Sequence, residues 1–458
     1  MVAMSSSGMA AARISELTLL NASQLFEQKI PLRQRYSPGQ VMIKLSEKYI
    51  HAIREFVQTI DYEDWYQTQQ ADHPYTRLVK IVSKLHSDFM DEGNVHHMIQ
   101  TVVARFMGAD GRVERTGLVA KSETSEDAEL LVGLIKTEIE AYPCEYELRI
   151  ELPSAQIFGE FKLELAPGIH LICNPYNFSP YGGKNEALAR ALIQSSDKNS
   201  TYLLIEASGY GDWNTDTPMA RGALARARQA SFILATYGVT ERAWYSEKIA
   251  RCSLTERASG GRWQLELPQA IAACFSDLTF KLTQLTIYEK KGLSILNVKE
   301  RPAETDAERV SALTRIVQPV GRYFASAGHC DHPSVAAAIE WYQDSIYADN
   351  QTFAYLAACI GLEALLAGND HLDSMTSRLI DRYSFLLGAG RKERQSLADE
   401  YSNVLKVRGK LVHAKQSRLT GEDKRYLDKV QAMLLRVIWR ELQSIYQSSQ
   451  DAIGTSIK

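Results

Sequence analysis

Closely spaced cysteines are missing from this chain, and none of its six cysteines forms a C-x-x-C motif. Most of them lie on or beside apolar segments. A disulfide framework needs denser and more regularly spaced cysteines, so we expect reduced, buried thiols, as in a cytoplasmic protein. The six are Cys144, Cys173, Cys252, Cys274, Cys330 and Cys359.

Long apolar segments are also missing. The best candidate for a membrane span, Thr352 to Ala367, is short and contains Glu363, so we expect no membrane-spanning helix. Met1 to Ala12 lacks a charged start followed by an apolar stretch, and we therefore expect no signal peptide.

Several motifs of known chemistry are absent or incomplete. No G-x-S-x-G motif is present, which argues against that class of serine hydrolase. Pro180 to Asn185 precedes an expected helix and has some likeness to a phosphate-binding loop, but the full P-loop pattern is missing. Ser208 to Asn214 is a glycine-rich loop with aromatic residues. It is either a recognition loop for a ligand or foreign protein, or a simple turn, and we favour the turn.

The formal charge of −3 gives no global basic field that would indicate nucleic acid. The charge is uneven, however, because residues 374–440 contain 15 Lys and Arg against 7 Asp and Glu. Such a cluster is either a set of solvated helix faces or an RNA-binding surface, and the charge alone leaves both interpretations open.

Two groups of side chains invite a metal-site interpretation. The first group surrounds Gly93 and Asn94, which we expect to break a helix, and no clean ligand spacing occurs in it. The second is His329 to His332, just before an expected helix, where Asp331 or Ser334 is better explained as an N-cap. We predict no metal site at either place. The residues of the first group are His86, Asp88, Asp91, His96 and His97.

The pattern of apolar residues predicts an α+β protein. Helical spacing dominates the first 110 residues, and alternating residues predict strands at Tyr146–Leu152, Phe161–Leu165 and Trp263–Leu267. Thr279 to Val298 predicts a hairpin around Lys290–Gly292. The helices expected before the C-terminal domain are Val41–Thr59, Tyr75–Met107, Asp127–Tyr142, Asn185–Ile193, Met219–Tyr237 and Ala307–Ala325, the last with a kink near Pro319.

We divide the chain into a helical N-terminal region (1–110), an α+β domain with a recognition or regulatory role (111–300), a linker and connecting helix (301–331), and an all-α bundle (332–450). The charged segment Lys299 to Asp306, which contains Pro302, is the expected linker. The helices expected in the bundle are Pro333–Ile346, Thr352–Ala367, Ser374–Leu387, Lys392–Val412 and Gly421–Tyr446.

Arg408 and His413 are the candidate functional residues of the bundle. Val404, Val407 and Leu411 form an apolar arc at about 100° per residue, and Arg408 lies inside that arc. A guanidinium there is costly unless it is paired or faces a cleft. Glu363 is the only charged residue between Thr352 and Asn369, so we predict that it contacts Arg408 or the segment beside it. That pair is either part of a site or a purely structural ion pair.

The Arg-x4-His spacing of Arg408 and His413 resembles the signature of HEPN ribonucleases. The helix Ala354 to Leu366 resembles the long first helix of the ApeA-like branch of that family, and Ser377–Leu379 and Phe385–Leu387 resemble its second helical segment. The resemblance covers residues 332 to 446. Gly409 stands where the family usually has a polar residue, and Ala414 where a glycine often follows the histidine.

The resemblance implies a HEPN-like helical bundle and a metal-independent RNA endonuclease that needs no cofactor. His413 would act as general base or acid and Arg408 would stabilise the phosphorane charge, in a cleft shared by two copies. Lys410, Lys415 and Arg378 would bind RNA. It further implies a toxin-like or antiviral-defence effector held inactive until a trigger protein or ligand acts on the N-terminal region. The alternatives are a catalytically silent HEPN module for RNA binding or dimerisation, and a protein-interaction sensor.

Overall fold

The computed structural model describes most of the chain beyond residue 43, and its contacts divide the chain into two compact units. Unit 1 contains residues 1–146, 208–220 and 256–263; unit 2 contains residues 147–207, 221–255 and 264–458. The described residues are 44–61, 73–108, 119, 126–152, 161–173, 201–211, 217–242, 252–256, 264–267, 275, 278–280, 286–290, 298–302, 304–367 and 375–455.

The described part of unit 1 is mainly helical. Its helices are α2 (Glu47–Val57), α3 (Pro74–Leu85), α4 (Glu92–Met107) and α5 (Glu126–Glu140). α2 packs against α3 and α5, and α4 packs against the same two helices. Their apolar faces meet in a core where Ile53, Leu78, Ile99 and Leu131 are fully buried, as the helical spacing of these residues predicts.

The break between α3 and α4 lies earlier than the sequence predicts. The chain leaves the helix at His86 and starts again after Asp91, whose side chain accepts a hydrogen bond from the backbone N–H of Asn94. The side-chain oxygen of Asn94 in turn accepts a hydrogen bond from the backbone N–H of Asp91. Gly93 and Asn94 therefore lie inside the first turn of α4 and do not break it, because this capping box begins the helix before them.

Several of the histidines and carboxylates of this region are buried or take part in packing and helix capping. His86 is buried, and the Nδ1 atom of His96 lies 2.6 Å from the hydroxyl oxygen of Tyr75. Asp91 caps α4. Within the described residues, the side chains of this group do not bring their donor atoms together as metal ligands would.

The main sheet has six described strands in the order β2-β3-β4-β1-β6-β7. β2 pairs antiparallel with β3, β3 with β4, and β6 with β7. The strands predicted from alternation are present as β1, β2 and β7, whereas β3, β4 and β6 were not predicted. The bounds are β1 (Cys144–Leu152), β2 (Phe161–Ala166), β3 (Ile169–Cys173), β4 (Thr201–Gly209), β6 (Cys252–Glu256) and β7 (Gln264–Glu266).

Helix α7 (Pro218–Thr236) joins the sheet to the C-terminal helices through its unit 2 residues. Arg226 donates a 2.9 Å hydrogen bond to the backbone oxygen of Glu206 on β4. Arg228 lies 2.9 Å from the carboxylate of Asp344, and the side chain of Gln343 donates to the backbone oxygen of Arg228. The sheet and the helical bundle of unit 2 therefore share one packed framework.

Helix α9 (Asp306–Ala325) packs against β2 and contains Pro319 in one continuous element. Its approach to the sheet requires a glycine, because a Cβ at Gly321 would come 2.7 Å from the backbone oxygen of Leu165. Thr305 and Glu308 form a capping box that begins α9.

Part of the expected linker is a strand. β9 (Thr286–Lys290) pairs antiparallel with β10 (Val298–Pro302), so the hairpin extends past Val298, where the prediction ended, and takes up Lys299 to Pro302. A proline is tolerated at the end of a strand, and Pro302 lies there, opposite Thr286. The remaining small sheet pairs β5 (Thr240–Arg242) with β8 (Leu278–Phe280).

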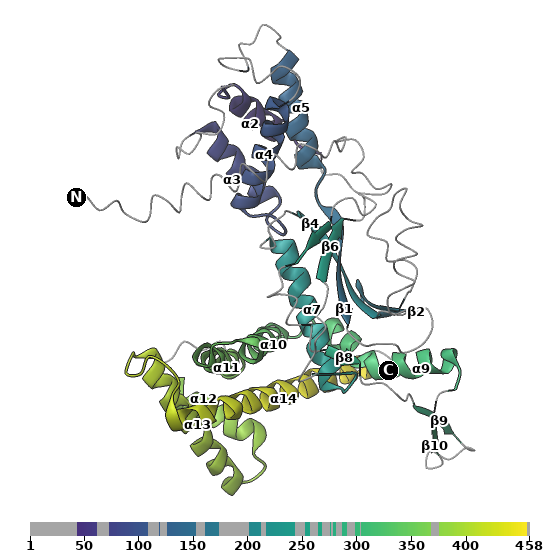
Figure 1. Ribbon diagram of the computed structural model, residues 1–458, viewed down its shortest axis with the longest axis vertical. Coiled ribbons are helices and arrows are strands. Elements are labelled where there is room, and N and C mark those ends of the chain that lie inside the picture. The colour runs from purple at the N-terminus through teal and green to yellow at the C-terminus, as the bar shows by residue number, and fades with distance from the viewer. Residues whose placement is uncertain are drawn as a thin grey trace, which may run out of the picture. The chain divides into compact units, whose positions relative to one another are not determined.

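The C-terminal region is all-helical, as predicted. α11 packs against α10 and α14, which lie beside it in Figure 1, and α12 packs against α13. The predicted last helix begins as a 3-10 turn, η4. The bounds are α10 (His332–Tyr347), α11 (Gln351–Leu366), α12 (Met375–Leu387), α13 (Arg391–Val412), η4 (Gly421–Lys424) and α14 (Arg425–Thr455).

Two loop predictions have different outcomes. β4 continues to Gly209, and Tyr210 is buried with its ring centroid 5.2 Å from that of Tyr142. The recognition-loop interpretation of Ser208–Asn214 therefore does not apply to Tyr210, because its ring packs on another aromatic ring of unit 1. The expected phosphate-loop segment, Pro180 to Asn185, lies outside the described residues, as do Met1 to Ala12 and Asn185 to Ile193.

No helix in the described part of the chain is both long enough and apolar enough to cross a membrane.

Candidate functional site

Helices α11 and α13 carry the candidate site and contact each other in unit 2. Asn350 caps α11 by accepting hydrogen bonds from the backbone N–H groups of Thr352 and Phe353. The buried hydroxyl of Tyr355 on α11 donates a 2.7 Å hydrogen bond to the backbone oxygen of Val404 on α13. A bond from one helix to the backbone of the next fixes their mutual position, so the side chains that follow Val404 are held against α11.

Glu363 and Arg408 form the central contact of the site. Arg408 Nη2 donates a 3.0 Å hydrogen bond to Glu363 Oε2, and Arg408 Nε lies 2.7 Å from Glu363 Oε1. The side chain of Glu363 is 21% exposed and that of Arg408 is 32% exposed. The contact that the two isolated charges predict is present, and its two-point geometry holds the plane of the guanidinium in one orientation.

Apolar side chains are exposed on the two helices that carry the ion pair. Phe353 and Ile360 on α11 are 49% and 38% exposed. Val412, one turn beyond Arg408 on α13, is 51% exposed. Leu356 on α11 and Leu405 on α13 are partly exposed. We refer to these five residues as the exposed apolar surface. Exposed apolar side chains that share helices in this way are more typical of an interaction surface than of a solvated helix face.

The groups behind the ion pair are buried and polar. Burial, and then the charge of Glu363, raises the pKa of the Cys359 thiol to about 12. Burial also raises the pKa of the hydroxyls of Tyr355 and Tyr401. These groups therefore stay neutral at physiological pH.

His413 lies at the end of α13, where the regular helix stops. It is the C-cap residue, its backbone N–H donates to the backbone oxygen of Gly409, and its side chain is exposed. Among the described residues, no hydrogen bond or ion pair links the imidazole to Arg408. Within one chain the structure thus brings Glu363 and Arg408 together but leaves His413 facing solvent.

The structure shows the local surroundings of the two positions, Gly409 and Ala414, that depart from the HEPN pattern. Ala414, where the family often has glycine, has φ of 53°, the left-handed region in which glycine is favoured. Gly409 lies in the last turn of α13, and a Cβ placed on it would meet no atom within 4 Å. An alanine after Arg408 therefore fits without a change in packing.

The predicted RNA-binding residues lie in three different settings. Lys410 is half exposed and its Nζ atom lies 3.1 Å from the carboxylate of Asp423 in η4, so its charge is already paired. Lys415, beyond the end of α13, and Arg378 on α12 are exposed. The sequence could not show the pairing of Lys410, because Asp423 reaches it only after the turn that follows α13.

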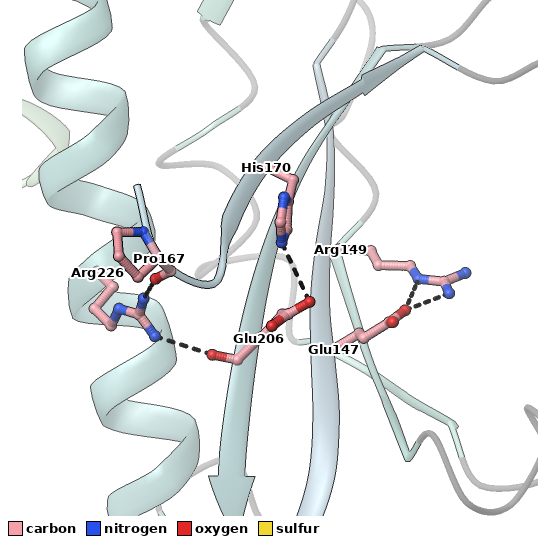
Figure 2. Close-up of polar contacts among 6 residues, drawn as sticks. All are labelled: Glu147, Arg149, Pro167, His170, Glu206 and Arg226. Carbon is pink, nitrogen blue, oxygen red and sulfur yellow. Dashed lines mark hydrogen bonds and ion pairs between the residues drawn. The ribbon is translucent and has the colours of Figure 1, made fainter. Parts of the chain in front are cut away.

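A second polar cluster lies on the main sheet and was not predicted (Figure 2). His170 on β3 is buried, and its Nε2 atom lies 3.2 Å from the carboxylate of Glu206 on β4. Arg226 donates to the backbone oxygens of Glu206 and Pro167. On β1, Arg149 is bonded to Glu147. Nothing in the sequence indicates the first contact, because it depends on the pairing of two strands that lie 36 residues apart.

No family model, curated protein or solved structure matches the chain.

Proposed function

We propose that the protein is a metal-independent RNA endonuclease of the HEPN type, with Arg408 and His413 as its catalytic residues. The observation that carries the proposal is the two-point contact between Glu363 and Arg408 on the two helices that carry the exposed apolar surface. A guanidinium held in one orientation on an apolar surface is suited to meet a phosphate at an interface that excludes water.

The residues divide the chemistry between them. The guanidinium of Arg408 has five N–H donors, and the contact with Glu363 leaves the others for phosphate oxygens. There they would stabilise the charge that develops on the phosphorane. The imidazole of His413 would take the proton from the ribose 2′-OH or give one to the leaving 5′-oxygen. Glu363 is a positioning residue, since it acts through Arg408.

A second copy of the chain would complete the site. One chain leaves Phe353, Ile360 and Val412 exposed on the helices that carry the ion pair. A two-fold arrangement brings the same surface of two copies together, which buries these side chains against each other and places two Arg408 groups in one cleft. Two such pairs supply both an acid and a base, which one pair alone does not.

The wider role follows from this activity. We propose a toxin-like or antiviral-defence effector in the cytoplasm, controlled by a trigger protein or ligand that binds the N-terminal region. The cysteines are few and none forms a C-x-x-C motif, which is consistent with a reducing compartment. The exposed Lys415 and Arg378 would contact the RNA backbone, and Lys410 would contribute only if its pair with Asp423 opened.

The alternative is a silent HEPN module that binds RNA or holds a dimer together without cleaving. The observation in its favour is that the guanidinium of Arg408 is already occupied by Glu363, while His413 has no contact with it. In that case the ion pair would fix the packing of α11 on α13, and the exposed apolar surface would be a dimer contact only.

An RNA cleavage assay in the presence of EDTA separates the two functions. We expect wild type to cleave a labelled single-stranded RNA, and His413→Ala to lose cleavage by at least about 100-fold, the usual contribution of general acid–base catalysis. Gln416→Ala, a neighbouring polar residue, is the matched control. RNA binding without cleavage by either wild type or His413→Ala would support the silent module and exclude the nuclease.

A further inference from the structure

The turn between α9 and α10 brings three different metal-ligand side chains together in unit 2. The Nδ1 atom of His329 lies 3.7 Å from Oδ2 of Asp331 and 3.9 Å from Sγ of Cys330. All three donor atoms lie within 4.8 Å of one another. Among the described residues, no other group of three or more His, Cys, Asp or Glu side chains brings its donor atoms this close together. We call it the turn cluster.

The explanation expected for Asp331 does not account for its side chain. Asp331 occupies the N-cap position of α10, but its carboxylate makes no capping hydrogen bond and its backbone is already helical, with φ of −88° and ψ of −9°. The N-cap prediction is therefore wrong for this side chain, because a capping carboxylate needs an extended backbone at that residue. The carboxylate instead lies beside His329.

The position of His329 suits a metal ligand. Its Nδ1 atom accepts a hydrogen bond from the backbone N–H of Asp331 at 3.3 Å. That distance is at the long end for an N–H···N contact. A cation could therefore replace the backbone N–H as the partner of Nδ1.

The separations of the donor atoms are close to those around a tetrahedral ion. Metal–ligand bonds of about 2.0–2.3 Å to nitrogen, oxygen and sulfur place tetrahedral ligands about 3.5 Å apart. The distances of 3.7 Å and 3.9 Å in the structure exceed that value by an amount that small side-chain rotations would close. Cys330 is exposed and His329 and Asp331 are partly exposed, so a cation can reach them from solvent.

We propose that His329, Cys330 and Asp331 bind a zinc ion at the turn between α9 and α10. A thiolate with an imidazole and a carboxylate is a ligand set for zinc rather than for magnesium or calcium, which prefer oxygen ligands. On binding, the Cys330 thiol releases its proton to solvent and the metal–sulfur bond forms, with no change of oxidation state. The site uses none of the residues of the proposed nuclease and does not depend on that function.

Zinc binding to the purified full chain tests this proposal directly. The protein is stripped with a chelator, loaded with Zn²⁺, and its affinity measured by competition with a chromophoric chelator. Wild type is expected to bind one zinc ion per chain, and His329→Ala and Cys330→Ser are each expected to lose at least about tenfold in affinity, since even groups behind the ligands contribute that much. His51→Ala is the matched control, because His51 is an exposed histidine 3.5 Å from the carboxylate of Glu55.

Co²⁺ in place of Zn²⁺ gives an independent result. Wild type should show a thiolate-to-cobalt charge-transfer band that Cys330→Ser lacks. Circular dichroism of each variant excludes misfolding as the cause of any loss. Failure of the wild type to bind Zn²⁺, or wild-type affinity in both His329→Ala and Cys330→Ser, would overturn the proposal. These readouts do not use RNA cleavage, so the failure of the metal site and the failure of the nuclease are distinguishable.

Discussion

Arg408 on α13 is held by Glu363 on α11, 45 residues earlier in the chain, through one 3.0 Å hydrogen bond and a second contact of 2.7 Å. Glu363 interrupts an otherwise apolar stretch of α11, and Arg408 lies inside an apolar arc of α13. The pair therefore satisfies two charges that would be costly if either partner were removed, and it sets the direction in which the remaining N–H groups of Arg408 point.

Removal of the carboxylate charge should destabilise unit 2. We expect Glu363→Gln to lower the free energy of unfolding by about 1–2 kcal/mol, because it leaves the guanidinium of Arg408 without its ionic partner on a partly buried surface. Urea unfolding followed by circular dichroism measures the change. The control is Asp423→Asn, which removes the partner of the half-exposed Lys410 and should cost about 0.5 kcal/mol or less. Equal effects of the two variants would show that the Glu363–Arg408 contact has no special role.

The exposed apolar surface should control self-association. We expect Ile360→Lys to make the protein monomeric at concentrations where wild type is dimeric, because a charge would have to be buried where the two copies meet. Sedimentation velocity over a concentration series measures this. Leu130→Lys is the control, since Leu130 is a similarly exposed apolar residue on α5 of unit 1. A wild type that stays monomeric, or an Ile360→Lys variant that dimerises normally, would contradict the proposed interface.

Two helical glycines should respond to alanine with opposite signs. A Cβ at Gly361 would come 2.7 Å from Leu434 and 3.1 Å from Trp341, so Gly361→Ala should cost about 1–3 kcal/mol through overpacking between α11, α14 and α10. A Cβ at Gly409 meets nothing, so Gly409→Ala should stabilise α13 by about 1 kcal/mol through helix propensity. Urea unfolding of both variants checks the signs, and a destabilised Gly409→Ala would show that this glycine has a packing role.

Unit 1 should lose stability in mild acid because of His86. Burial lowers the pKa of this imidazole below its ordinary value of 6.5, an effect that the backbone of Ile139 partly offsets. Between the folded pKa and 6.5 the unfolded chain binds more protons, so stability falls as pH decreases through that window. The melting temperature between pH 7.5 and 5.5 should fall less in His86→Gln than in wild type. His51→Gln, at an exposed site, is the control and should follow wild type.

The helices of the C-terminal region could be predicted from the sequence because each buries one stripe of a regular repeat, and α10 to α13 begin and end within about two residues of expectation. β3 could not be predicted, because a five-residue buried strand such as Ile169–Cys173 has no alternation to distinguish it from a short helical segment. The sequence assigns Lys299 to Pro302 to the linker rather than to the hairpin, because a proline favours a loop in most contexts. Only the pairing of Pro302 with Thr286 shows that this segment is a strand.

The candidate site was predictable only in part. The contact between Glu363 and Arg408 followed from two isolated charges that each needed a partner. The exposure of Phe353 and Ile360 did not follow, because α11 is apolar around most of its circumference and the sequence cannot tell which stripe the other helices leave uncovered. The position of His413 depended on where α13 ends, and the pairing of Lys410 depended on the turn after it.

The cleavage rate of a monomeric variant tests the shared cleft most directly. Ile360→Lys retains Arg408, His413 and Glu363, so it differs from wild type in the proposed interface and not in the catalytic residues. The account predicts that wild type cleaves labelled RNA in EDTA with a rate per chain that rises with protein concentration, and that Ile360→Lys cleaves at least about tenfold more slowly, because each site needs groups from two copies. Cleavage by monomeric Ile360→Lys at the wild-type rate, or no cleavage by dimeric wild type, would contradict it.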